Sequence, residues 1–136
     1  MKLKQLFLSI ENFCASELLL VTIMPPSPVV ICLFAKKLKV KIKTGKKSSA
    51  LLLFKKPIKF HGGKVGILTA GTSDIGVAEE SRLMCEAMNC KCIISYDVGV
   101  AGIHRIFPIL KEMIEEDVDC IIVAAGMEGS LATLVS

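Results

Sequence analysis

Three loops in this sequence combine hydroxyl, carboxylate, imidazole and guanidinium groups, and each follows a short apolar run. They are Ala70–Asp74, Asp97–Arg105 and Ala125–Gly129. Hydroxyls and backbone N–H groups at a helix start bind phosphate, and an arginine binds an anion through two parallel donors. Together the three loops predict a binding site for a phosphorylated small molecule.

The first loop places two hydroxyls and a carboxylate at a helix start. We expect Thr72, Ser73 and the backbone N–H groups to hold a phosphate, and Asp74 to contact a ribose hydroxyl. The same residue types also have a structural explanation, because Ser73 or Asp74 could act as the N-cap of the following helix. Taken singly, this loop does not separate a cap from a ligand contact.

The other two loops each add a group that could take part in catalysis. His104 and Arg105 supply a titratable imidazole and an anion donor, although a histidine at a helix start is often structural. Glu128 could act as a general base or hold a metal ion. Its structural explanation is a first-turn acid favoured by the helix dipole.

The pattern of apolar residues predicts the elements that position these loops. We expect strands at Val65–Leu68, Cys92–Tyr96 and Cys120–Ala124, helices at residues 77–88 and 103–114, and a third helix after Gly129. Strands that alternate with helices through short loops form a parallel sheet with right-handed crossovers. The fold class is therefore α/β, and the loops lie at the carboxyl ends of the strands, where such folds bind ligands.

The helical periodicity also predicts which side chains face the sheet. For the first helix these are Val77, Met84, Cys85 and Met88, and for the second they are Ile103, Phe107, Leu110 and Ile114.

The composition divides the chain into two parts. The 136 residues are 52% hydrophobic, which allows one domain with a core and excludes a disordered protein. Residues 1–60 hold 12 lysines and two acidic residues, a net charge of +10, whereas residues 61–136 have a net charge of −6. This asymmetry is typical either of a basic arm attached to an acidic domain or of two unrelated pieces of sequence.

The first sixty residues carry weak functional signals. The apolar run 18–35 is interrupted by prolines at 25, 26 and 28, so it does not form a simple spanning helix, and residues 1–10 are too short for a signal peptide. Residues 36–47 alternate lysines with apolar residues, which predicts an exposed edge strand. Because arginines and aromatic residues are missing there, we expect no nucleic-acid partner and no membrane partner.

The six cysteines lie in apolar runs without Cys-x-x-Cys spacing. They are Cys14, Cys32, Cys85, Cys90, Cys92 and Cys120. We interpret them as buried thiols, and leave open a chelating or redox pair formed by Cys90 and Cys92.

The three loops in this order resemble the LarB family of the PurE-like (aminoimidazole ribonucleotide carboxylase) superfamily. The resemblance rests on Val65–Asp74, Tyr96–Arg105 and Val123–Gly129, and it covers residues 62–136. It implies a three-layer, flavodoxin-like domain with a parallel sheet, here incomplete at its C-terminus, and homo-oligomers of the complete protein. Residues 1–60 do not resemble the family's N-terminal region and fit a mispredicted gene start.

The resemblance implies a cytoplasmic enzyme that carboxylates the pyridinium ring of nicotinic acid adenine dinucleotide with CO2 and hydrolyses its phosphoanhydride, in nickel-pincer cofactor synthesis. CO2 is then a co-substrate, no cofactor is tightly bound, and Mg²⁺ is the metal ion to consider. The implied catalytic residues are Glu128 and His104. The implied substrate-binding residues are Thr72, Ser73, Asp74, Gly102, His104, Arg105, Gly126, Met127 and Gly129.

Two alternatives remain. The purine-pathway carboxylases of the superfamily, which act in de novo IMP synthesis, carry a catalytic histidine at the position that Ser130 occupies here. LarB proteins carry a catalytic cysteine in a segment that follows the region matched by this chain. A non-catalytic nucleotide-binding fragment is therefore the second alternative.

Overall fold

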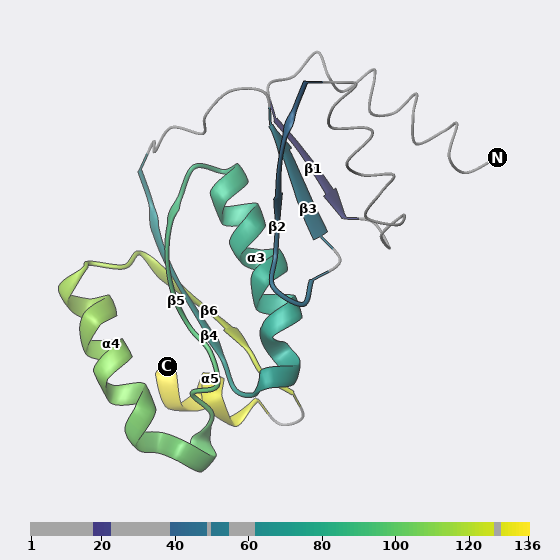
Figure 1. The fold of residues 1–136 in the computed structure, drawn as a ribbon. Helices are drawn as coiled ribbons and strands as arrows, with labels where there is room; N and C mark the ends of the chain where they lie inside the picture. Colours follow the sequence, from purple (N-terminus) through teal and green to yellow (C-terminus); the bar gives the residue numbers. More distant parts are fainter. Residues whose placement is uncertain (1–17, 23–38, 49, 55–61, 127–128) are drawn as a thin grey trace.

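The computed structural model describes residues 18–22, 39–48, 50–54, 62–126 and 129–136. Strands and helices alternate from β4 onward, so the fold is α/β, as the sequence predicts (Figure 1). In chain order the elements are β1 (Leu18–Thr22), β2 (Lys41–Thr44), β3 (Ala50–Phe54), β4 (Lys64–Thr69), the 3-10 helix η1 (Thr72–Asp74), α3 (Ile75–Ala87), β5 (Lys91–Ser95), the 3-10 helix η2 (Val100–Arg105), α4 (Ile106–Glu115), β6 (Cys120–Ala124) and α5 (Ser130–Val135).

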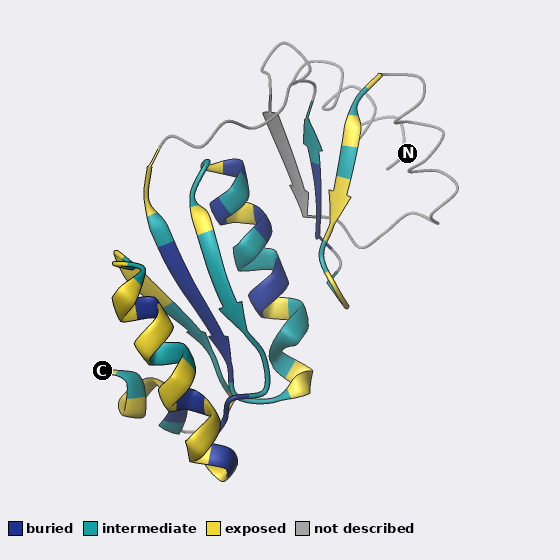
Figure 2. Cartoon of the chain, turned by 60° about the vertical axis from the view of Figure 1, so that its left-hand side comes forward, coloured by how far each residue is buried: buried dark blue, intermediate teal, exposed yellow. Residues whose placement is uncertain are grey.

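β4 is the central strand of a parallel sheet with the order β5-β4-β6. Val65 pairs with Cys92 of β5 and with Cys120 of β6. Because β4 is covered on both faces, it is apolar at consecutive positions instead of alternating (Figure 2). The three predicted strands are confirmed, with β5 beginning and ending one residue earlier than expected.

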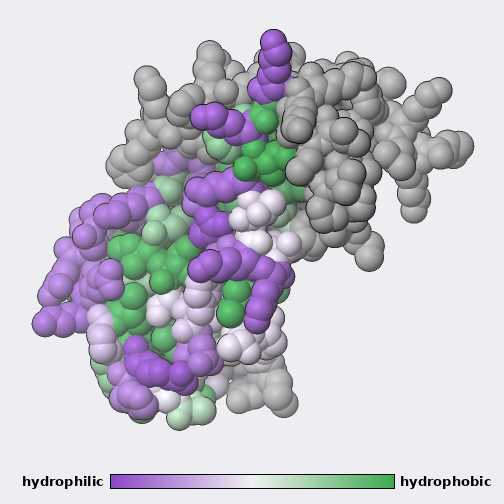
Figure 3. All heavy atoms as spheres, viewed as in Figure 1, coloured by the Kyte–Doolittle hydropathy of each residue, from purple (hydrophilic) through white to green (hydrophobic). Residues whose placement is uncertain are grey.

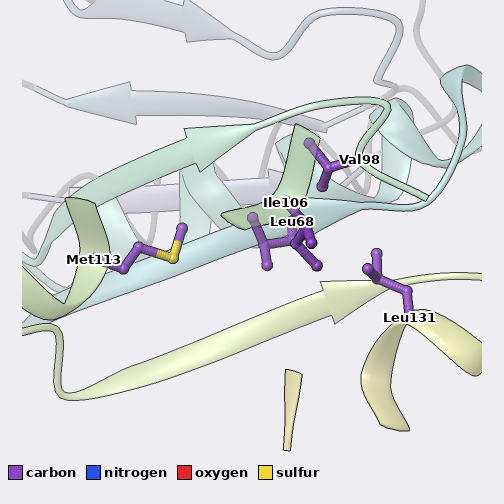
Figure 4. Packing of buried hydrophobic residues seen from close by; sticks show 5 residues of the cluster. All are labelled: Leu68, Val98, Ile106, Met113 and Leu131. Atoms are coloured by element: carbon purple, nitrogen blue, oxygen red, sulfur yellow. The ribbon is translucent and has the colours of Figure 1, made fainter. Parts of the chain in front are cut away.

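One face of the parallel sheet packs against α4 and α5. Five buried side chains form a hydrophobic cluster there, namely Leu68, Val98, Ile106, Met113 and Leu131 (Figure 4). Gly66 of β4 allows α4 to approach, because a Cβ at this position would lie 2.7 Å from the sulfur of Met113. The middle of β4 is therefore in close contact with the helix.

The other face packs against α3, and α3 is itself covered by a second sheet. This second sheet is antiparallel, with the order β1-β3-β2 (Figure 1). Leu52 of β3 is fully buried and packs with Leu83 and Ala87 on the outer side of α3. Ala78 and Cys85 of α3 belong to the cluster on the parallel sheet. α3 thus lies between two sheets.

The basic segment before residue 60 contributes to this second sheet. β2 lies at its edge, Lys41 and Lys43 are exposed, and Ile42 is half-buried, which confirms the predicted lysine-faced edge strand for Lys41–Thr44. The strand is shorter than the predicted range 36–47, of which residues 36–38 lie outside the described residues. The strand β1 was not predicted, because it lies in the proline-interrupted apolar run. Within the ranges that the structure describes, no helix is long and apolar enough to cross a membrane.

The predicted inner face of α3 is right for Cys85, which is buried, and wrong for its other three residues. Val77, Met84 and Met88 are 61%, 47% and 66% exposed, whereas Leu83 is fully buried. The reason is that sheets cover the helix on two sides, so its buried positions spread around the helix. The three exposed residues follow one another at helical spacing along the strip that remains between the sheets.

The predicted inner face of α4 is right for Leu110, which is half-buried against the core, and wrong for its other three residues. Ile106 and Met113 are buried, whereas Phe107 and Ile114 are 58% and 78% exposed. The predicted face assumed one continuous helix from residue 103. The chain instead forms η2, with a non-helical backbone at Gly102, before α4 begins. Within α4, Ile106, Ile109 and Met113 are apolar as well, so the sequence has two overlapping apolar faces and the structure buries this second one.

The four cysteines in the described ranges are free thiols with different exposure. Cys85 is buried, Cys90 and Cys92 are intermediate, and Cys120 is exposed because β6 is an edge strand. Burial raises the pKa of the Cys92 thiol to about 12 and also raises that of Cys85, so both stay protonated at neutral pH. The prediction of buried thiols is thus right for Cys85 and wrong for Cys120; Cys14 and Cys32 lie outside the described residues.

Replacing Leu52 by alanine tests whether the second sheet is packed on α3. We expect Leu52→Ala to lower the free energy of unfolding by about 2–5 kcal/mol, because it leaves a cavity between β3 and α3. Urea unfolding followed by circular dichroism measures the change. The control is Val77→Ala on the exposed strip of α3, which should change stability by less than about 0.5 kcal/mol. An equally small effect at Leu52 would contradict the packing.

Candidate functional site

Hydrogen bonds join the carboxyl ends of the three parallel strands. The Val98 N–H donates to the Thr69 carbonyl over 2.9 Å, and the Gly99 N–H donates to the Ala70 carbonyl over 3.0 Å. On the other side, the Ala70 N–H donates to the Ala124 carbonyl of β6 over 2.9 Å. The loops that the sequence singles out therefore begin side by side at one edge of the sheet, as the parallel arrangement requires.

The first loop leads into η1 and α3. The Asp74 carboxylate accepts hydrogen bonds from the Gly71 N–H over 3.0 Å and from the Ser73 hydroxyl over 3.3 Å. Asp74 thus closes the turn before the helix and does not cap the N–H groups of α3 through its side chain. Thr72 and Ser73 are exposed, so their hydroxyls are accessible to a ligand.

Arg105 is the cation of the second loop, at the end of η2. Its Nη1 donates to the Asp97 carboxylate over 2.8 Å, and both side chains are 45% exposed. The guanidinium also lies against Gly102, where a Cβ would be 2.5 Å from Nε. Gly102 is therefore needed for the arginine to lie in this place. The neighbouring His104 is exposed.

The third loop is described only at its two ends. The Gly129 N–H donates to the Gly126 carbonyl over 3.2 Å, and Gly129 has a φ of 64°, a conformation that favours glycine. Ser130 then begins α5. Met127 and Glu128 lie outside the described residues, so their predicted roles stay predictions.

Two residues that shape this edge were not predicted from the sequence. Thr69 is fully buried at the end of β4, and its hydroxyl accepts a hydrogen bond from the Asp97 N–H over 2.9 Å. Asp97 has a φ of 58°, a left-handed conformation that is uncommon outside glycine. A polar residue that ends a buried apolar strand was the available signal for Thr69.

Glu79 is a buried carboxylate on the second turn of α3, and it too was missed. It is 1% exposed and accepts hydrogen bonds from Arg82 Nε over 2.9 Å and Nη2 over 3.0 Å. The Tyr96 hydroxyl at the end of β5 also donates to it, as does the Lys46 N–H over 2.7 Å. The carboxylate thus connects α3, β5 and the turn between β2 and β3.

These contacts shift the pKa values of the Glu79 carboxyl and the Tyr96 phenol. Burial alone would raise the pKa of Glu79, but the hydrogen bonds from Arg82, Tyr96 and Lys46 outweigh it and lower the pKa from 4.5 to about 2. Burial and the Glu79 carboxylate raise the pKa of Tyr96 to about 12. At neutral pH the pair is therefore a carboxylate that accepts from a neutral phenol.

The turn between β2 and β3 places lysines beside α3. The Lys46 ammonium lies 5.6 Å from the centre of the Tyr96 ring, which is within the range of a cation–π contact. The turn contacts the first turn of α3 closely, because a Cβ on Gly76 would be 2.7 Å from the Lys47 carbonyl oxygen. Part of the basic segment thus lies next to the helix that follows the first loop.

A metal site is not visible in the part of the chain that the structure describes. No group of three or more histidine, cysteine or acidic side chains there is arranged to hold a metal ion. This result gives no support to a chelating pair formed by Cys90 and Cys92. Glu128, the predicted metal-assisting residue, is outside the described residues.

Comparisons with known proteins give one informative relative. No family model matches the chain. The chain is 57% identical over 96 residues to the uncharacterized protein MJ0165 of Methanocaldococcus jannaschii. The match covers 70% of this chain and 38% of that protein, so the chain spans well under half the length of its relative.

The matched stretch is longer than the segment from Gly62 to Ser136, so it includes residues before Gly62. The name of the relative states no activity. The resemblance to LarB-like proteins therefore stays a prediction after this comparison.

The low pKa of Glu79 predicts how stability depends on pH. Its folded-state pKa lies below its ordinary value, so the ionised group stabilises the fold above about pH 4.5, and this contribution is lost as the pH falls towards 2. We expect Glu79→Gln to lower stability at pH 7. We also expect it to reduce the slope of stability against pH between 2 and 4.5, by up to about 1.4 kcal/mol per pH unit.

Urea unfolding at a series of pH values measures that slope. Glu112→Gln, at an exposed position of α4, is the control and should keep the wild-type slope. If Glu79→Gln also keeps it, the hydrogen-bonded carboxylate does not exist as described.

Proposed function

We propose that this protein binds a phosphorylated nucleotide where β4, β5 and β6 end. The observation that carries the proposal is the set of hydrogen bonds between the strand ends, which keeps the exposed hydroxyls of Thr72 and Ser73 next to the loop of Arg105. Hydroxyls, the N–H groups at the start of α3 and a partly exposed guanidinium are complementary to phosphate oxygens.

We further propose that the parallel sheet is part of a flavodoxin-like domain. Its first strand, β4, is central, and its helices lie on both faces. In such sheets the ligand lies where neighbouring strands lead to helices on opposite faces. Here both neighbours of β4 meet this condition, because β4 leads to α3 on one face, whereas β5 and β6 lead to α4 and α5 on the other.

For the reaction, we propose the one that the resemblance implies, carboxylation of a nicotinic acid adenine dinucleotide-type substrate with CO2 and hydrolysis of its phosphoanhydride. In carboxylation a C–C bond forms and the ring carbon loses a proton, for which Glu128 or His104 is the proposed acceptor. In hydrolysis a water oxygen bonds to phosphorus and loses its proton, while the bond from phosphorus to the bridging oxygen breaks and a phosphate group leaves; Arg105 would stabilise the negative charge on the phosphoryl oxygens.

We also propose that the working protein is a homo-oligomer. A groove of about 360 Å³ between α4, β6 and α5 is lined by Leu110, Met113, Ile114, Asp117, Val118, Ile121 and Val135. In the space-filling view, hydrophobic side chains also gather between α3 and α4, with hydrophilic ones around them (Figure 3). Apolar surface of this kind is typical of contacts with further protein.

Binding of nicotinic acid adenine dinucleotide, measured by isothermal titration calorimetry, tests the site. We expect Arg105→Ala to weaken binding by about tenfold or more, because it removes a charge-assisted hydrogen bond. The control is Lys111→Ala, which removes an exposed cation of α4 and should leave the affinity unchanged. A wild-type protein that does not bind the dinucleotide, or equal affinity in Arg105→Ala, would overturn the proposed site.

Mass spectrometry of the dinucleotide after incubation with ¹³C-bicarbonate tests the reaction. We expect a labelled carboxyl group on the product when the wild-type chain is present. Binding without incorporation would instead support the non-catalytic alternative for this chain.

A further inference from the structure

Asp97 has a backbone conformation that needs an explanation. It is not glycine, yet its φ is 58°, and it directly follows Tyr96 at the end of β5. Aspartate is one of the few residues besides glycine that tolerate a left-handed conformation, and the surroundings hold it in this one. Two hydrogen bonds to Thr69 of β4 hold it here: the Asp97 N–H donates to the Thr69 hydroxyl, and the Val98 N–H donates to the Thr69 carbonyl.

The consequence of this conformation is the direction of the Asp97 carboxylate. It accepts from Arg105 Nη1 over 2.8 Å, eight residues further along the chain. Gly102 lies against the other side of the guanidinium, where a Cβ would be 2.6 Å from Nη2. The Asp97 carboxylate thus binds this arginine, and the missing side chain at Gly102 leaves the room for it.

Stability does not explain the pair. Both side chains are 45% exposed, and an ion pair exposed to this degree contributes little to the free energy of folding. The arrangement therefore points to a role of the arginine in binding.

We propose that Asp97 is a positioning residue that orients Arg105 towards an anionic group of the ligand, and this inference rests on the proposed nucleotide site. The Asp97 carboxylate accepts one hydrogen bond from Arg105 Nη1. The guanidinium has five N–H donors in total, so donors remain for a phosphate. A free arginine loses about 2 kcal/mol of rotamer entropy when it becomes fixed. An arginine that is already held does not lose it again on binding.

A competing role for Asp97 predicts the opposite change in ligand affinity when its carboxylate is removed. If Asp97 only occupied Arg105 in the empty site, a ligand anion would have to displace the carboxylate, and removal of Asp97 would tighten binding. If Asp97 positions Arg105, its removal weakens binding. An asparagine, which keeps the acceptor oxygen and tolerates the left-handed conformation, should then restore binding.

The experiment uses inorganic pyrophosphate as the probe and isothermal titration calorimetry as the measurement. Asp97→Gly removes the carboxylate without backbone strain, because glycine readily adopts a φ of 58°. We expect it to weaken pyrophosphate binding by about tenfold. We expect the pyrophosphate affinity of Asp97→Asn to lie within about threefold of the wild-type affinity, so most of the loss is restored.

The matched control is Asp117→Gly. Asp117 also has a left-handed backbone, with a φ of 55°, but it lies at the opposite end of the sheet, just before β6. This variant should bind pyrophosphate like the wild type. Thermal unfolding of every variant confirms that the protein tested is folded.

The Arg105→Ala background distinguishes the inference from the proposed function. We expect Asp97→Gly to have no further effect on pyrophosphate affinity in that background, because the group it positions is gone. An equal loss in both backgrounds, unchanged or tighter binding by Asp97→Gly, or failure of Asp97→Asn to restore binding would overturn the inference alone. If Arg105→Ala itself binds pyrophosphate like the wild type, the proposed site fails and the inference fails with it.

Discussion

A carboxylate that leaves water costs several kcal/mol unless other donors replace its hydration, and Glu79 is such a group. Its donors come from three separate parts of the chain, namely Arg82 on the same helix, Tyr96 at the end of β5 and the backbone of Lys46. If one of these parts moved away, the remaining carboxylate would be buried without full compensation. The ion pair and its hydrogen bonds therefore fix the relative positions of α3, the parallel sheet and the β2–β3 turn.

The candidate site depends on this arrangement because its second loop begins one peptide bond after Tyr96. Tyr96, which Glu79 holds, is followed directly by Asp97, so the start of the second loop is fixed from the buried side of the sheet. On the other side, Thr69 fixes the same loop through its hydroxyl and its carbonyl. The backbone at the start of the second loop is thus held on both sides, so its exposed side chains can contact a ligand at a small entropic cost.

The sequence predicted the elements that depend on local pattern. Strand β6 has the predicted bounds, and the first two loops follow their strands as expected, because apolar runs bounded by glycine and polar residues identify buried parallel strands. The lysine-faced edge strand was also predicted correctly. The assignment to the LarB family, and the roles of Glu128 and Met127, stay predictions.

The errors have a common cause, which is contact between distant segments. The inner face of α3 was wrong except for Cys85, because nothing in its own sequence reveals that a second sheet covers its outer side. Glu79 precedes another glutamate and reads as part of a solvated helix surface, while its partners Tyr96 and Lys46 are 17 and 33 residues away. The conformation of Asp97 likewise depends on Thr69, 28 residues earlier.

The position of α3 between two sheets also bears on how this protein can change over evolutionary time. A helix that packs on both sides has few positions where a new side chain is tolerated, whereas α4 has exposed charged positions outside the proposed contact surface, such as Lys111, Glu112 and Glu115 (Figure 2). Substitutions should therefore accumulate faster in α4 than in α3. In distantly diverged copies of this fold, the helix after the first loop would be the segment that remains recognisable.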